Sequence, residues 1–384
     1  MTESKEAIDV AIIGGGVVGL SAACTVAGRG HQTCVIEREQ RFGLGGSTHN
    51  SGVIHAGIYY PTDSLKATLC VEGNERLYSF CRKHDIPHNR CGKLIVTDSN
   101  NLATLEALVT LGRTNGVKHL ELVDRAFIRK REPYVEAVAA LWSPSTGIVE
   151  AESLIRILTK EATSQDVALL PSTQLKGGAD SDDVLEVRTG HETIMARTVV
   201  NAGGLYADEV SAAFGGNPFT IYPVRGDYAE LIADANNLIR GLVYPLPDAS
   251  GHGLGVHATR TTWGTVTLGP TARYQNQKDD YESHRDSLEH FHKAACRFLP
   301  SLKIDQLKPG GSGIRARSAP ADAAFSDFRI GRDSQVPRLI HAAGIDSPGL
   351  TAALAIAERI ADLVDTTLTS VSYTHLTLPT NREV

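Results

Sequence analysis

Two kinds of hydrophobic pattern alternate along the 384 residues of this chain. Short uninterrupted apolar runs at residues 10–13 and 33–36 predict buried strands, and the segment 16–27 between them predicts a helix that Gly28 ends. Apolar residues at helical spacing predict further helices over residues 64–84, 103–115, 151–163 and 350–364. Between residues 219 and 271 the pattern is instead that of antiparallel strands interrupted by Gly and Pro.

The order of these segments predicts two domains, since a chain of this length exceeds what one hydrophobic core usually organises. Segments typical of a nucleotide-binding fold occur at both ends and in the middle, which predicts a discontinuous domain of residues 1–85, 147–216 and 315–368. A strand-rich domain of residues 86–146 and 217–314 is then inserted into it in two pieces. Residues 369–384 lose the helical period, and we expect a disordered tail that resembles translated cloning sequence.

A glycine motif directly follows the first apolar run. Residues 14–19 read Gly-Gly-Gly-Val-Val-Gly, and Glu37 ends the next apolar run, eighteen residues after Gly19. In a dinucleotide-binding fold Gly14 makes the tight turn from strand to helix, Gly16 lets the backbone approach a pyrophosphate, and Gly19 lets the helix pack on the strand. An acid at the position of Glu37 accepts hydrogen bonds from ribose hydroxyls. An ordinary glycine turn is the alternative, but the strand, the spacing and the acid together favour an adenine dinucleotide.

Three further loops place small residues where a backbone could approach the same ligand. They are the glycine- and serine-rich segment 43–57, the segment 200–208 with a glycine pair after an apolar strand, and the segment 344–351 that opens the last helix. If they are not three unrelated loops, they hold a ligand longer than a nicotinamide dinucleotide, between two helix N-termini. The candidate cofactor-binding residues are Gly14, Gly16, Val17, Val18, Gly19, Glu37, Arg38, Gly46, Ser47, Thr48, Asn50, Ser51, Gly52, Ala202, Gly203, Gly344, Ser347, Pro348, Gly349, Leu350 and Thr351.

Charge and composition exclude several other classes of protein. The net charge of −6 gives no general basic field for nucleic acid or an anionic membrane. No apolar run reaches the roughly 18 residues that a membrane-spanning helix needs. The six cysteines include no CxxC pair, and we expect reduced thiols rather than disulfides or metal ligands. These features predict a cytoplasmic enzyme without a metal site, and they leave open a peripheral contact with the inner face of the membrane.

The motifs also carry a family resemblance. In order, GGGVVGL, VIEREQRFG, GGSTHNSGVIHAGIYY, NAGGLYAD and GIDSPGLT resemble the D-amino-acid-oxidase-type (DAO) superfamily of FAD-dependent oxidoreductases. Within it, residues 49–60 and 64–67 resemble the L-2-hydroxyglutarate dehydrogenase/oxidase family. Further matches lie at residues 223–228, 254–257, 268–270 and 313–315. The resemblance covers residues 8 to about 366. Where the family usually has Gly-Ile-Arg-Pro-Lys, residues 313–317 read Gly-Ile-Arg-Ala-Arg.

The resemblance implies a fold, a cofactor and a reaction. The fold is α/β, with a Rossmann-like FAD-binding domain of the glutathione-reductase type and an inserted α+β substrate domain built on an antiparallel sheet. The reaction is hydride transfer from an L-2-hydroxy acid, foremost L-2-hydroxyglutarate, to flavin N5, followed by electron transfer to oxygen, quinone or another carrier. The alternatives are a related flavoenzyme, such as a glycerol-3-phosphate dehydrogenase or amino-acid oxidase, and a flavin-binding protein that does not turn over.

Such a reaction requires particular side chains around the substrate. A carboxylate is best held by the planar fork of an arginine, for which Arg315 and Arg317 are the candidates. An imidazole near neutral pH suits removal of the hydroxyl proton, and His55 and His257 lie inside the family-like motifs. For the second carboxylate of a diacid the alternative cations are Lys66, Arg225 and Arg260. Tyr59 and Tyr60 are candidates for hydrogen bonds to the substrate, and core-filling tyrosines are the alternative.

Overall fold

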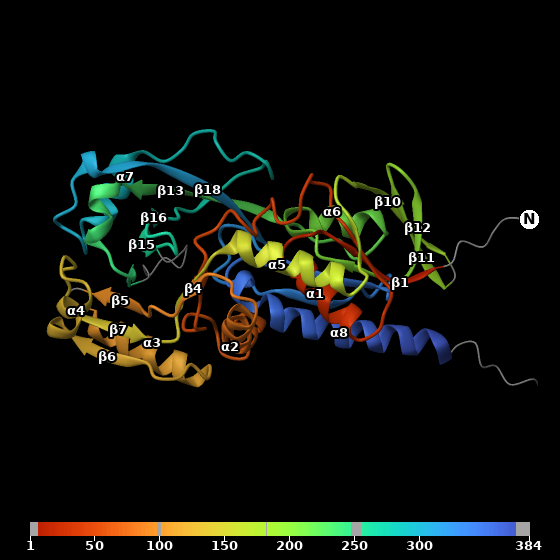
Figure 1. Ribbon diagram of the computed structural model, residues 1–384, viewed down its shortest axis with the longest axis horizontal. Coiled ribbons are helices and arrows are strands. Elements are labelled where there is room, and N and C mark those ends of the chain that lie inside the picture. Colours follow the sequence, from red (N-terminus) through yellow and green to blue (C-terminus); the bar gives the residue numbers. More distant parts are fainter. Residues whose placement is uncertain (1–6, 98–100, 182, 247–254, 374–384) are drawn as a thin grey trace, which may run out of the picture.

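The computed structural model describes residues 7–97, 101–181, 183–246 and 255–373. The strands gather into two large sheets that lie at opposite ends of an elongated molecule (Figure 1). One end carries β1 and β10–β12 beside α1 and α8, and the other carries β5–β7, β13, β15 and β16 with α4 and α7. The long strand β18 runs from the second end towards the middle.

Within the described residues, eight strands form the first sheet, with a parallel centre. Strand β1 (Ile8–Ile13) pairs in parallel with both β2 (Thr33–Ile36) and β12 (Thr193–Asn201), so that Ile12 lies opposite Val35 and Val200. Because parallel strands end at the same edge, the loops that follow β1, β2 and β12 meet there. The remaining strands are β9 (Ala168–Leu170), β10 (Leu175–Ser181), β11 (Val184–Thr189), β19 (Arg329–Arg332) and β20 (Leu339–Ala343).

Helices cover this sheet and place two of their N-termini at the same edge. Helix α1 (Val17–Gly28) packs Ala22, Ala23 and Val26 in one core cluster with Ile356 and Ile360 of α8 (Gly349–Tyr373). Helix α2 (Leu65–Lys83) crosses α8 so closely that a Cβ at Gly73 would lie 2.4 Å from the carbonyl oxygen of Thr351. Helices α5 (Ala151–Ser164) and α6 (Ala207–Ala213) complete this end.

Helix α8 continues beyond the point where the sequence predicts a disordered tail. It runs to Tyr373, and Thr367 and Leu368 are 2% and 6% exposed. The Thr369 hydroxyl donates to the carbonyl oxygen of Asp365, one turn earlier, which is a contact that helical threonines commonly make. Burial of Leu368 thus outweighs the weak helix propensity of the Thr and Ser residues there. The rest of the predicted tail, residues 374–384, lies outside the described part of the chain.

The second sheet is mostly antiparallel. Strand β5 (Lys93–Thr97) pairs in parallel with β14 (Leu242–Pro245), and the other pairs are antiparallel. Its other strands are β6 (Glu121–Asp124), β7 (Ala139–Ser143), β13 (Tyr222–Leu231), β15 (His257–Arg260), β16 (Val266–Gly269), β17 (Arg273–Tyr274) and β18 (Leu307–Arg317). Helices α3 (Leu102–Thr114), α4 (Arg125–Arg131) and α7 (Leu288–Ala295) pack on it, and β3 (Val53–Ile54), β4 (His88–Asn89) and β8 (Gly147–Val149) form a small third sheet.

The strands distribute over the predicted domain ranges with one exception. Described strands of the first sheet fall within residues 7–85, 147–216 and 315–368, and those of the second within 86–146 and 217–314, except that β18 ends at Arg317. The exact domain boundaries therefore stay a prediction. Strand β18 extends three residues past the predicted boundary at residue 314, and this extension carries Arg315 and Arg317 towards the first sheet.

Candidate active site

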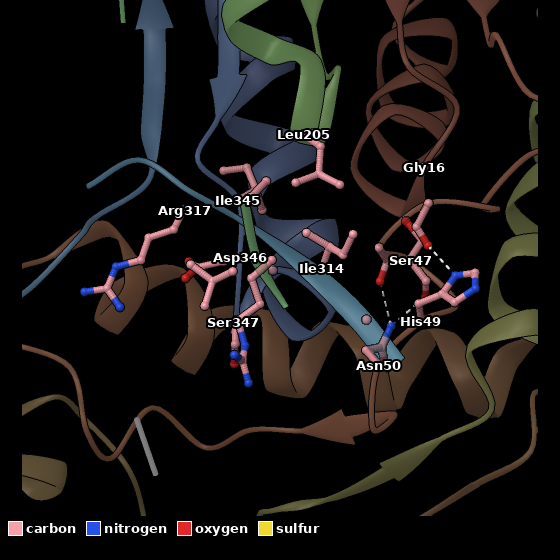
Figure 2. Close-up of a pocket in the computed structure, with 18 of the residues that line it drawn as sticks. Gly16, Ser47, His49, Asn50, Leu205, Ile314, Arg317, Ile345, Asp346 and Ser347 are labelled. Atoms are coloured by element: carbon pink, nitrogen blue, oxygen red, sulfur yellow. Dashed lines mark hydrogen bonds between the residues drawn. The ribbon is translucent and has the colours of Figure 1, made fainter. Parts of the chain in front are cut away.

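A cavity of about 1320 Å³ lies where the two sheets face each other. Its walls include the ends of β1, β2 and β12 on one side and residues of β13 and β18 on the other. This volume exceeds the roughly 300–1,000 Å³ of an ordinary ligand pocket. The cavity therefore has room for an extended ligand and a small molecule together. Figure 2 shows Ile314 and Arg317 of β18 together with residues of the segments that follow strands of the first sheet, such as Gly16 and Ser47.

The turn after β1 is shaped for close backbone approach. Gly14 has φ +110°, a conformation that favours glycine, and a Cβ there would lie 2.3 Å from the carbonyl oxygen of Ala202. A Cβ at Gly19 would lie 1.9 Å from the carbonyl oxygen of Gly14, so the helix packs directly on the turn. Gly14, Gly16 and Ala202 line the cavity. This is the geometry that a pyrophosphate at the N-terminus of α1 requires.

Glu37 sits at the end of β2 and holds the glycine turn. One carboxylate oxygen accepts the Gly15 N–H at 2.7 Å and the other accepts the Glu39 N–H at 2.9 Å. Each carboxylate oxygen has a second lone pair, so acceptor capacity remains for ribose hydroxyls on the cavity side. Next to it, the Arg38 guanidinium stacks 3.6 Å from the ring centroid of Tyr206.

The glycine-rich loop after β2 is fixed by its own side chains and by β18. Ser47 Oγ accepts the N–H of Val17 at 2.9 Å, and the Asn50 amide donates to the carbonyl oxygens of Gly46 and Ser47 at 3.0 and 2.7 Å (Figure 2). A Cβ at Gly313 of β18 would lie 2.1 Å from the carbonyl oxygen of His49. The loop thus rests on the strand that carries the two candidate arginines.

A second helix N-terminus, that of α8, reaches the same cavity. Ser347, Pro348, Gly349 and Leu350 line it. Thr351 faces inwards instead, where its hydroxyl accepts the N–H of His55 at 2.9 Å and ties the helix to the segment after β3.

Most of the predicted cofactor residues line the cavity, and a few support it from behind. The lining members are Gly14, Gly16, Val17, Val18, Glu37, Arg38, Gly46, Ser47, Asn50, Ser51, Ala202, Gly203, Ser347, Pro348, Gly349 and Leu350. The predicted residues that do not line it are Gly19, Thr48, Gly52, Gly344 and Thr351. Gly52 and Gly344 instead have positive φ and close backbone packing, which explains why glycine is needed there without a ligand contact.

Arg315 and Arg317 both line the opposite end of the cavity, two residues apart on β18. Arg315 donates one hydrogen bond, from Nη1 to the carbonyl oxygen of Thr271 at 3.3 Å, and Arg317 donates from Nη2 to that of Ala323 at 3.1 Å. Since a guanidinium carries five N–H donors, each has donors left for a ligand. No carboxylate among the described residues lies within 4.0 Å of either guanidinium.

His55 and His257 line the same end and are both neutral. Burial lowers the pKa of His55 to about 3, and the nearby Lys93 and His257 act in the same direction. Burial likewise lowers the pKa of His257 to about 3, with Lys93 and Arg315 acting in the same direction. His257 Nδ1 lies 3.0 Å from the carbonyl oxygen of Gly255, and because a carbonyl only accepts, Nδ1 carries the proton. Nε2 of His257 therefore has a free lone pair.

Tyrosines form much of the remaining wall. The predicted Tyr59 and Tyr60 line the cavity, joined by Tyr228 and Tyr244 from the second sheet. Burial raises the pKa of Tyr59 and Tyr60 well above the usual value, so both hydroxyls stay protonated. The Tyr244 ring stacks on His257 with the centroids 3.7 Å apart.

Three predicted cations do not line the cavity. Lys66 Nζ pairs with Asp346 at 2.5 Å, and both side chains are buried. Arg225 pairs with Asp227 at 3.1 Å on the opposite face of β13 from the cavity, and both are 2% exposed. Arg260 donates to the carbonyl oxygens of Asn236 and Ile239 at 2.7 and 2.9 Å. Lys66 and Arg225 are thus held in ion pairs, and Arg260 is held by main-chain carbonyl oxygens, outside the cavity lining.

Sequence reasoning missed side chains that the fold brings to this end. Tyr228 lies three residues after Arg225, and the two-residue period of β13 puts it on the cavity face with Val224 and Gly226. That period was a usable signal. Lys93 also carried a signal, because it begins the otherwise apolar run 93–97 and lysines are rarely buried unless they are paired. Tyr244 carries no comparable local signal.

The chain matches the DAO family, described as FAD dependent oxidoreductase, over residues 9–363. It belongs to this family. The L-2-hydroxyglutarate dehydrogenase of Escherichia coli (strain K12) is 30% identical over 416 residues, covering 98% of this chain and 97% of that protein. The mitochondrial L-2-hydroxyglutarate dehydrogenase of Nematostella vectensis is 33% identical over 414 residues, covering 94% of this chain and 91% of that protein.

Solved structures of flavoenzymes resemble this DAO-family chain over nearly its whole length. L-alpha-glycerophosphate oxidase from Mycoplasma pneumoniae, determined with FAD bound, superimposes with a TM-score of 0.86 at 25% identity and covers 94% of this chain and 95% of that one. Glycine oxidase from Geobacillus kaustophilus gives a TM-score of 0.81 at 22% identity, covering 94% of this chain and 95% of that one. The predicted mixed α/β fold and the FAD cofactor are confirmed.

The site fits FAD on its own geometry as well. Two helix N-termini, the Gly14 turn and the Glu37 carboxylate line one end of the cavity, as a dinucleotide requires. This DAO-family enzyme is an FAD-dependent oxidoreductase, and its reaction requires both a substrate and an electron acceptor. No helix in the described part of the chain is long and apolar enough to cross a membrane.

Proposed function

We propose that this enzyme oxidises an L-2-hydroxy acid, with L-2-hydroxyglutarate as substrate and 2-oxoglutarate as product. The relatives that carry the name L-2-hydroxyglutarate dehydrogenase are 30% to 34% identical over most of the chain, which supports this substrate. The observation that carries the proposal is that Arg315 and His257 line the same end of the cavity. No carboxylate of the described residues neutralises Arg315, and His257 is neutral with its Nδ1 proton held by Gly255.

Arg315 is proposed to bind the carboxylate next to the reacting carbon. Its guanidinium contacts Thr271 through one N–H, and the planar fork can give two parallel hydrogen bonds to a carboxylate. Arg315 also lies near enough to His257 to lower the pKa of that ring. A substrate held by Arg315 would therefore have its hydroxyl close to His257.

His257 is proposed to accept the hydroxyl proton at Nε2. Its Nδ1 proton is held by the carbonyl oxygen of Gly255, which fixes the tautomer that a base needs. An anionic substrate favours the charged imidazolium and so raises the lowered pKa of His257 towards a useful range. When bound, FAD supplies the acceptor for the hydride that leaves the α-carbon. Loss of that hydride and of the hydroxyl proton leaves the carbonyl group of the 2-oxo acid.

His55, Tyr59, Tyr60 and Arg317 are proposed to complete the substrate site. His55 Nε2 lies 3.3 Å from Ser347 Oγ at the N-terminus of α8, which places the ring between the flavin-binding segment and the substrate end. The buried tyrosine hydroxyls can donate to a carboxylate because they remain protonated. The electron acceptor is proposed to be oxygen, a quinone or another carrier. The rate at which each of them reoxidises the reduced flavin would distinguish them.

Glycerol 3-phosphate is the second candidate substrate. The L-alpha-glycerophosphate oxidase of Mycoplasma pneumoniae has the same fold at a TM-score of 0.86. A phosphate could use the same two arginines as a carboxylate.

An anaerobic substrate panel tests the proposal directly. The purified flavoenzyme is mixed without oxygen with L-2-hydroxyglutarate, its D-enantiomer, glycerol 3-phosphate or glycine, and the oxidised-flavin absorbance is followed. We expect bleaching with L-2-hydroxyglutarate and none with the D-enantiomer. Bleaching by glycerol 3-phosphate alone would overturn the substrate assignment, and bleaching by no acid tested would favour a flavin-binding protein without turnover.

A further inference from the structure

Lys93 is a buried lysine without an acidic partner among the described residues. It begins β5, is 1% exposed, and lies in register with Leu242 of β14 and Ser143 of β7. No carboxylate oxygen of the described chain comes within 4.0 Å of its ammonium. Buried Lys66, by contrast, pairs with Asp346 at 2.5 Å. A buried ammonium that is not neutralised within the fold is costly, and it invites an anion from outside.

The Lys93 ammonium lies against the wall of the cavity. Nζ is 4.6 Å from the ring centroid of Tyr59 and 4.6 Å from that of Tyr244, and both rings line the cavity. Contact with two ring faces offsets part of the cost of burying the charge. The lysine stem is flexible, so Nζ can move between the rings towards a ligand.

Two more polar atoms at this end lack a partner. Tyr59 Oη and His55 Nδ1 are buried, and neither has a hydrogen-bond partner among the described residues. Buried polar groups are nearly always hydrogen-bonded, so unpaired atoms in a ligand cavity indicate a missing ligand or water. Lys93 and the Tyr59 hydroxyl are both donors. An acceptor at this end of the cavity would satisfy both donors, and an anionic acceptor suits the ammonium best.

Two cations without an acidic partner among the described residues lie near the proposed base. Lys93 Nζ lies 4.6 Å from the centroid of the Tyr244 ring, which stacks on His257 at 3.7 Å, and the charges of Lys93 and Arg315 both lower the pKa of His257. A substrate with two carboxylates can contact both cations and keep its reacting carbon near His257. A monocarboxylate would leave one cation without a partner.

We propose that Lys93, together with the Tyr59 hydroxyl, binds the carboxylate remote from the reacting carbon, while Arg315 binds the carboxylate next to it. This assignment rests on the proposed function and makes Lys93 the residue that selects dicarboxylate substrates. We prefer Lys93 to Lys66 and Arg225, which carboxylates of the fold neutralise, and to Arg260, which donates to main-chain carbonyl oxygens.

The assignment has a consequence for proton uptake. Burial lowers the pKa of Lys93 to about 7, with the Cys70 thiol acting weakly in the opposite direction. The other titratable groups that face Lys93 stay uncharged near neutral pH, because burial lowers the pKa of His55 and His257 and raises that of Tyr59, Tyr244 and Cys70. A bound carboxylate raises the pKa of Lys93 again. Diacid binding should then take up a proton at about pH 8, and less at about pH 6, where Lys93 already carries one.

The test compares two substrates that differ in the remote carboxylate alone. L-2-hydroxyglutarate and L-2-hydroxypentanoate are each mixed anaerobically with holoenzyme, and the flavin-reduction rate constant is divided by the substrate Kd. We expect wild type to prefer the diacid by about tenfold to a hundredfold, the range for a hydrogen bond to a charged group. In Lys93→Met, which keeps the length of the apolar stem, the preference should fall to near one, because the value for L-2-hydroxyglutarate should fall further than the value for L-2-hydroxypentanoate. Arg315→Met should lower both values.

If Lys93→Met lowers the values for both substrates by the same factor, or changes neither, the preference for the diacid is unchanged and the assignment is overturned. Glutarate and pentanoate, which are not oxidised, provide the same comparison through the shift of the flavin spectrum on binding. If wild type fails to oxidise L-2-hydroxyglutarate, the proposed function fails, yet the glutarate preference still tests Lys93 by itself. If Lys93→Met does not fold, proton uptake by the wild type is measured by calorimetry in buffers of different ionisation enthalpy. Uptake on binding glutarate but not on binding pentanoate supports the assignment. Equal uptake for both acids would contradict the assignment.

Discussion

At the dinucleotide end of the cavity the wall is mostly backbone from a few local motifs, whereas at the substrate end it is side chains from distant segments. Gly14, Gly16 and Glu37 belong to one strand–helix–strand unit, in which the Glu37 carboxylate accepts the N–H of Gly15 and a Cβ at Gly14 would collide with the main chain of Ala202. The substrate end combines His55 after β3, His257 of β15 and Arg315 of β18, with Lys93 of β5 behind them. Polar groups also differ: Glu37 accepts two N–H groups, while Lys93 has no acidic partner in the described chain.

This difference teaches how the two kinds of site respond to change. A backbone site tolerates side-chain substitution except where a Cβ would collide with main chain. A site made of side chains loses one defined interaction at a time. The predictions below separate cofactor binding from substrate chemistry on that basis.

The largest effect is expected from Gly14→Ala. The new Cβ would lie 2.3 Å from the Ala202 carbonyl oxygen at φ +110°, so the turn must shift. Strain of about 1–3 kcal/mol plus the collision should weaken FAD binding by roughly a hundredfold, seen as colourless purified protein. Gly30→Ala is the control, because Gly30 has φ +91° but nothing within 4 Å. Equal FAD loss in both variants would mean that FAD binding depends on the positive φ of a glycine alone, and not on the close packing of Gly14 against Ala202.

Arg315→Met should leave FAD content unchanged and slow flavin reduction. Loss of a two-point contact to a carboxylate should cost about tenfold to a hundredfold in kcat/KM, measured with L-2-hydroxyglutarate. Reoxidation of already reduced flavin should hardly change, since no carboxylate takes part in it. Arg317→Met is the matched comparison on the same strand face. A larger defect at Arg317 would move the carboxylate to that residue.

Glu37→Ala should weaken FAD retention by about tenfold, because charge-assisted hydrogen bonds to ribose are lost and solvation offsets part of the loss. The melting temperature should also fall, since the Gly15 and Glu39 N–H groups lose their acceptor. Flavin content after dialysis and thermal unfolding measure the two effects. Glu39→Ala, which removes an exposed ion pair with Arg38, should change neither. Full flavin occupancy in Glu37→Ala would remove Glu37 from the cofactor site.

Truncation at the C-terminus should affect neither end of the cavity and should give the smallest change in activity. Removal of residues 374–384 is expected to leave the melting temperature and flavin content unchanged. Removal of everything after Asp365 also deletes Leu368, which packs in the core beside α1, and should cost about 1.5–3 kcal/mol of stability. Identical melting temperatures for the two truncations would show that the end of the helix contributes nothing.

Strand geometry explains which substrate residues could have been predicted. The family-like motif at 223–228 contains both Arg225 and Tyr228, and the chemistry of a carboxylate favours the arginine. Once β13 is a strand, however, the two residues point to opposite faces, and Arg225 meets Asp227 and Asp280 away from the cavity. Arg315 and Arg317 are two residues apart on β18, so they lie on the same face of the strand, and both line the cavity. Residue type alone was thus a poor guide, and residue type with strand period a better one.

The sequence by itself determined the dinucleotide end. Its chemistry lies in a turn, a helix N-terminus and an acid within residues 14–37, and short-range spacing specifies all three. Only the tertiary structure decided the substrate end. Whether Lys66, Arg225 or Lys93 is available to a ligand depends on which carboxylate packs beside each cation. Asp346 lies 280 residues beyond Lys66 in the chain, and no local pattern records that they meet.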